Sequence, residues 1–148
     1  NNVPKADDGL LAQEAAIRKI IDDISKLTKE QQTILKPQTD TLGGLLDKIA
    51  ALKAQETDII NRFSKIPTAD DGIMAQKETI QKLLEDVSKL TPEQKAHLKT
   101  QLDALNALTG KIEALKSQEE TIINRINSIP VTEDGLIAQK DAIKAIIE

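Results

Sequence analysis

Apolar residues recur along this chain at the spacing of an amphipathic helix. Between positions 73 and 90, isoleucine, leucine and valine return at intervals that match successive helical turns. At about 100° per residue these side chains fall on one stripe, and polar residues occupy the other faces. The pattern predicts a short helix over 73–90 and another over 10–27. The stripe consists of Ile73, Ile80, Leu83, Leu84, Val87 and Leu90.

A longer stripe follows each short one. From position 98 to position 126 the apolar residues keep one slowly drifting helical phase. Gly43 and Gly44, with Asn106 at the matching place, suit helix ends and offer the alternative of two short helices. A loop would normally reset the phase, so its continuity favours one long helix over 29–65 and one over 92–128. Each would contain about 36 residues and measure roughly 54 Å.

The same pattern returns after 63 residues. The segment 3–9 recurs at 66–72 and again at 129–135, and 33 of the first 63 positions are identical in the next copy. Self-similarity at a fixed period is the signature of a repeat architecture. The sequence therefore predicts one repeat over 1–65, a second over 66–128 and the start of a third over 129–148, with a helix over 136–148.

A short helix can cover only half of a long one. The short helix before a long helix would cover its first half, and the next short helix would cover its second half. The expected fold is all-α, with tandem 63-residue helical repeats that form overlapping three-helix bundles in an elongated rod. The complete bundle would span about 46–109. This topology resembles that of the spectrin-type repeat, although the unit is shorter and has no Trp.

Helix starts are marked by capping residues. Thr28 and Thr91 each stand three residues before a Gln, as in a capping box. Each recurring acidic-Gly turn places a carboxylate before a short helix, where it favours the N-terminal dipole. We predict helix caps and not Ca²⁺ sites, because the alternating oxygen ligands of an EF-hand are absent. The acidic caps predicted in this way are Asp8, Asp71 and Asp134.

Polar residues interrupt the apolar stripes at matching places in the copies. A partner-binding spot is one interpretation. We favour a structural polar layer that fixes helix register, because a buried polar group needs a hydrogen-bond partner. The predicted layer consists of Gln13, Gln76 and Gln139 in the short helices and Glu56 and Glu119 in the long ones.

Composition narrows the possible chemistry. The chain has no Cys and one His, His97, so thiolate metal sites and Cys nucleophiles are excluded. We predict no catalytic residue, no cofactor and no metal. The net charge of −4, with both signs interspersed, argues against nucleic acid as a partner. No apolar run approaches the roughly 20 residues that a membrane-spanning helix needs.

These features favour a non-catalytic structural spacer or stalk. The chain begins without Met and ends within a helical pattern, so we interpret it as a segment of a larger tandem-repeat protein. A cell-surface adhesin is the preferred setting, and a cytoplasmic setting stays open. The alternatives are a three-helix module that binds a host or partner protein, and an intracellular scaffold that self-associates.

Overall fold

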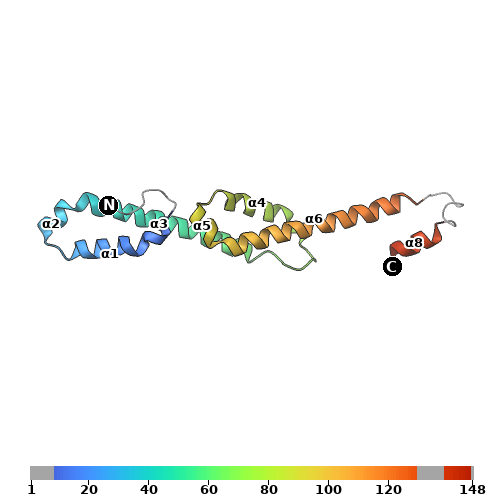
Figure 1. Ribbon diagram of the computed structural model, residues 1–148, viewed down its shortest axis with the longest axis horizontal. Coiled ribbons are helices and arrows are strands. Elements are labelled where there is room, and N and C mark those ends of the chain that lie inside the picture. The colour runs from blue at the N-terminus through green and yellow to red at the C-terminus, as the bar shows by residue number, and fades with distance from the viewer. Residues whose placement is uncertain (1–8, 130–138, 148) are drawn as a thin grey trace.

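The computed structural model describes residues 9–129 and 139–147 of the chain. The all-α prediction is confirmed, since the described residues form helices and turns and contain no strand. Figure 1 shows the helices arranged along one long axis. The α-helices are α1 (Glu14–Ser25), α2 (Lys29–Ile34), α3 (Lys36–Phe63), α4 (Lys77–Ser88), α5 (Pro92–His97), α6 (Lys99–Asn127) and α8 (Lys140–Ile147).

Each of the two short helices with a described start begins in a 3-10 turn. The turn η1 (Leu11–Gln13) leads into α1, and η2 (Met74–Gln76) leads into α4. The glycine before each turn has a positive φ, 77° at Gly9 and 84° at Gly72. A residue with a Cβ is disfavoured in this left-handed region, which explains the glycine of the recurring Asp-Gly pair.

Each predicted long helix is divided near its start, which corrects the prediction of one unbroken helix. Leu35 separates α2 from α3 with φ −89° and ψ 2°, and Leu98 separates α5 from α6 with φ −94° and ψ 14°. Pro37 follows the first bend, but Thr100 occupies the matching place after the second. Proline is therefore not the common cause. Leu98 is buried in the core, so packing of this corner accounts for the bend there.

Beyond these bends the long helices are continuous. Gly43 and Gly44 lie within α3, and Asn106 lies within α6, so none of them ends a helix. Their intrinsic preference for helix ends is overridden by the apolar stripe that runs through them. The continuous phase in the sequence is reproduced as 28 residues of helix in α3 and 29 in α6.

Two apolar clusters lie along the molecule, and α3 contributes to both. The first cluster joins α1 to the N-terminal half of α3, with Ile17 and Ile49 fully buried at its centre. The second joins the C-terminal half of α3, the whole of α4 and the N-terminal half of α6, with Leu83 and Leu105 fully buried. No loop separates the two clusters, because α3 passes without interruption from one to the other.

Candidate functional site

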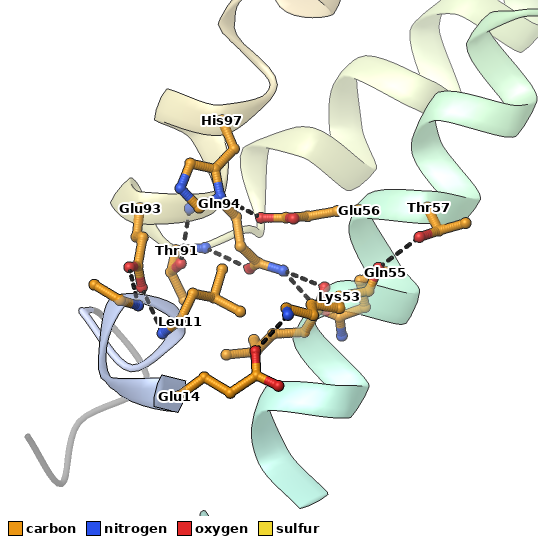
Figure 2. Close-up of polar contacts among 12 residues, drawn as sticks. Leu11, Glu14, Lys53, Gln55, Glu56, Thr57, Thr91, Glu93, Gln94 and His97 are labelled. Atoms are coloured by element: carbon orange, nitrogen blue, oxygen red, sulfur yellow. Dashed lines mark hydrogen bonds and ion pairs between the residues drawn. The ribbon is translucent and has the colours of Figure 1, made fainter. Parts of the chain in front are cut away.

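A set of polar contacts lies where the two apolar clusters meet, at the middle of α3 (Figure 2). Side chains from η1 and α1, from α3 and from α5 converge there. We call this set the polar joint. It consists of Leu11, Ala12 and Glu14 from the N-terminal segment, Lys53, Gln55 and Glu56 from α3, and Thr91, Glu93, Gln94 and His97 around α5.

Gln94 is the buried centre of the polar joint, with only 1% of its surface exposed. Its Nε2 donates to the carbonyl oxygen of Leu52 at 2.9 Å and to Oε1 of Gln55 at 3.4 Å. Its Oε1 accepts from the backbone N–H of Thr91 at 3.1 Å. One side chain therefore completes the cap of α5 and ties that helix to α3.

Glu93 links α5 to the N-terminal segment. Its two carboxylate oxygens accept from the backbone N–H groups of Leu11 at 3.0 Å and Ala12 at 2.8 Å. The first N–H groups of a helical segment have no partner within the helix, and a carboxylate there is favoured by the dipole. Glu93 thus holds the start of the first short helix against α5, which belongs to the second repeat.

Two further contacts surround this centre. Lys53 of α3 donates to Glu14 of α1, and Arg18 donates to the same carboxylate at 2.8 Å. The hydrogen bonds from Lys53 and then from Arg18 lower the pKa of Glu14. On the other side, Nδ1 of His97 lies 3.1 Å from Oε1 of Glu56. These contacts connect the middle of α3 to α1 and to α5.

The predicted polar layer corresponds only in part to these contacts. Glu56 belongs to the polar joint, whereas Glu119 is exposed to solvent. Gln13, Gln76 and Gln139 are partly buried, and the backbone N–H groups of the first two close 3-10 turns. The buried interhelical contact belongs to Gln94. Gln94 is not among the residues predicted for the polar layer. Its place in the apolar stripe, four residues after Leu90 and four before Leu98, is the signal that could have identified it.

The structure forms complete capping boxes at Thr28 and Thr91. Each hydroxyl accepts from the N–H of the Gln three residues later, and that Gln bonds back to the Thr backbone. The predicted helix cap at Asp71 is not formed, because α4 begins only at Lys77, after the 3-10 turn η2. Neither η2 nor α4 has a side-chain cap. The predicted caps Asp8 and Asp134 lie outside the described residues.

Outside the polar joint, a separate ion pair connects α3 to α4. Arg62 donates to Asp86 at 2.8 Å and to Asp58 of its own helix at 3.3 Å. The hydrogen bond from Arg62 is the main cause that lowers the pKa of Asp86, and Lys89 adds to it. The pair fixes the position of the end of α3 along α4.

Acid is expected to weaken the Arg62–Asp86 contact. The pKa of Asp86 in the folded chain lies below its unfolded value of about 3.9, so this contact stabilises the fold above about pH 4. That contribution is lost as the pH falls through the lower, folded-state pKa. Thermal unfolding followed by circular dichroism should show a larger difference between wild type and Asp86→Asn at pH 7 than at pH 2.

The matched control for this prediction is Asp23→Asn. Asp23 is the residue 63 positions before Asp86, and it contacts Lys26 of its own helix at 3.5 Å. Equal destabilisation by Asp86→Asn at both pH values would contradict the ion-pair role. The expected difference is small, since Asp86 is partly exposed and ion pairs near the surface contribute little.

The polar groups of the joint and of the α3–α4 pair bond to neighbouring helices or to their own helix. Within the described ranges, no three His, Asp or Glu side chains are grouped as a metal site would require. No helix among the described residues is long and apolar enough to cross a membrane. No family model, no curated protein and no solved structure matches the chain. The arrangement is suited to holding helices at fixed positions.

Proposed function

We propose that the chain is a non-catalytic spacer that holds other parts of a protein at a distance. The observation that carries this proposal is the passage of one helix, α3, through two successive apolar clusters. A helix shared between clusters resists bending where a loop would act as a hinge. The polar joint at its middle adds contacts from α1 and α5 that oppose rotation of one cluster against the other.

The positions of the helices support a tandem arrangement of overlapping bundles, with the spectrin-like topology expected from the sequence. Helices α4, α5 and α6 begin at 77, 92 and 99, and α1, α2 and α3 begin at 14, 29 and 36, so each offset is 63 residues. In such an array each unit stabilises its neighbours through shared interfaces, and length grows by addition of units.

Spin labels test the proposed stiffness directly. The chain contains no Cys, so the double variant Asp40→Cys/Glu120→Cys can be labelled only at these two exposed sites. Asp40 lies on α3 and Glu120 on α6, on either side of the second cluster. We expect a single narrow distribution of distances in a pulsed electron resonance measurement, because no flexible joint lies between the labels.

The control pair Asp103→Cys/Glu120→Cys lies within α6 and gives the width expected for one rigid helix. A distribution for the α3–α6 pair that is several times broader than this control would show a flexible hinge. Such a result would overturn the spacer proposal in its rigid form.

The setting that we propose is the stalk of a cell-surface adhesin. Repeated helical units with mixed surface charge suit a stalk, because they extend without presenting a reactive group. Antibody labelling of intact cells of the source organism tests the setting. Labelling only after the cells are made permeable would instead favour the intracellular scaffold.

A further inference from the structure

Three consecutive residues of α5 bond to three different elements of the fold. Glu93 accepts from two backbone N–H groups of η1, at 3.0 Å and 2.8 Å. Gln94 donates to a backbone carbonyl oxygen of α3 at 2.9 Å. Lys95 donates to the carbonyl oxygen of Ser88, the last residue of α4, at 2.6 Å. A helix of only six residues therefore connects the first apolar cluster to the second.

The start of the first short helix depends on α5 for its cap. Neither η1 nor α1 has a side-chain cap from its own N-cap residue. The first N–H groups of a helix lack partners within it, and here the carboxylate of Glu93 supplies both acceptors. Leu10 and Leu11 lie at this start and are buried in the first cluster. The cap that holds these two side chains in place comes from a residue 82 positions further along the chain.

Helix α5 does not depend on η1 to the same extent. It begins with its own capping box at Thr91, and Gln94 ties it to α3. Leu98, directly after its last residue, is 2% exposed in the second cluster. The coupling free energy between α5 and η1 is the same in both directions. Its loss has unequal effects, because α5 keeps its other contacts whereas η1 loses its cap.

We propose that α5 is a conformational latch, which keeps the start of the first short helix folded only while α5 is packed on the second cluster. Figure 2 shows the basis of this link, with Glu93 directed at η1 and Gln94 directed at α3. When α5 detaches, the N–H groups of Leu11 and Ala12 lose both acceptors and the start of the helix frays. Local unfolding then passes from the second cluster to the first, against the direction of the chain.

Hydrogen exchange of single backbone amides in the full chain, followed by NMR, tests the latch. Glu93→Ala removes both acceptors, and we expect Leu11 and Ala12 to exchange about two- to thirtyfold faster, as for the loss of a helix cap. Glu30→Ala is the matched control, because Glu30 has the same place in the first turn of α2 but is exposed. It should leave the exchange of both amides unchanged.

A second variant detaches α5 without altering Glu93. Leu98 belongs to the second cluster and Leu11 to the first, so Leu98→Ala weakens the packing of α5 from the far side of the latch. Leu11 and Ala12 should exchange faster in this variant, in step with the amide of Lys95 in α5.

The reverse experiment disturbs η1 instead. Gly9 has a φ of 77°, so Gly9→Ala strains the turn that precedes η1. We expect faster exchange at Leu11 and Ala12. The amide of Lys95, which donates to the carbonyl oxygen of Thr91 at 2.9 Å, should change much less.

Four results would overturn the proposal: no change at Leu11 and Ala12 in Glu93→Ala, an equal change in Glu30→Ala, faster exchange of α5 alone in Leu98→Ala, or equal acceleration of η1 and α5 in Gly9→Ala. The latch goes beyond the proposed spacer function, although both rest on the polar joint. Any of these results with a narrow spin-label distribution would remove the latch and leave the spacer. A broad distribution with the expected exchange pattern would do the opposite.

Discussion

Replacing Ile59 by alanine is expected to lower the free energy of unfolding by about 2–4 kcal/mol, the usual range for truncating a buried isoleucine. Ile59 lies on the C-terminal half of α3, where it packs against residues of α4 and α6. Removing its side chain leaves a cavity between three helices, and close-packed neighbours relax only partly into such a space. Urea unfolding followed by helical circular dichroism measures the effect.

The chain supplies its own control for this substitution. Ile122 has the same residue type, lies on α6 and is followed by the same residues, Ile, Asn and Arg. It is nearly half exposed, so Ile122→Ala should cost less than about 1 kcal/mol. Similar losses for both variants would show that Ile122 is buried as fully in solution as Ile59. That result would contradict the different exposures of these two side chains.

Replacing Gln94 by alanine is expected to cost about 1–3 kcal/mol, because it leaves buried polar groups without their partner. Gln94 bonds to the Leu52 carbonyl and to the backbone N–H of Thr91, and water has little access to either bond. The substitution also removes a side chain that fills the space between α3 and α5. Urea unfolding is again the appropriate measurement.

Gln31→Ala is the matched control for Gln94→Ala. Gln31 forms the same capping box with Thr28, but its side chain is exposed. Water can replace its hydrogen bonds, so we expect a loss of at most about 1 kcal/mol. If the two variants are equally destabilised, Gln94 acts only as a helix cap and the polar joint does not connect α5 to α3.

Much of the fold could be predicted from periodicity. The phase of the apolar residues predicted the bounds of the short helices to within a few residues. It also predicted correctly that the long helices continue through Gly43, Gly44 and Asn106. The bends at Leu35 and Leu98 could not be predicted in this way, because a change of ψ at one residue leaves the phase almost unaltered. Leu98 is buried in the second cluster, so packing around it favours that bend.

The polar joint was harder to predict than the helices. A Gln in an apolar stripe signals a buried hydrogen bond, and Gln94 fits this description as well as Gln13 or Gln76 do. Its partner is a backbone carbonyl at Leu52, which leaves no mark in the sequence. Glu93 is similar, since it bonds to the N–H groups of Leu11 and Ala12, 82 and 81 residues away.

The shared helix also determines how the molecule would respond to mechanical tension. The chain runs along α3, returns along α4 and runs forward again along α6, so a pull on α3 and α6 draws them in opposite directions past α4. The helices are then loaded in shear. The Arg62–Asp86 pair and the apolar contacts of the second cluster resist this sliding together. Forced unfolding is governed by the rate of this step. A segment built in this way is expected to bear load without lengthening until many contacts break at once.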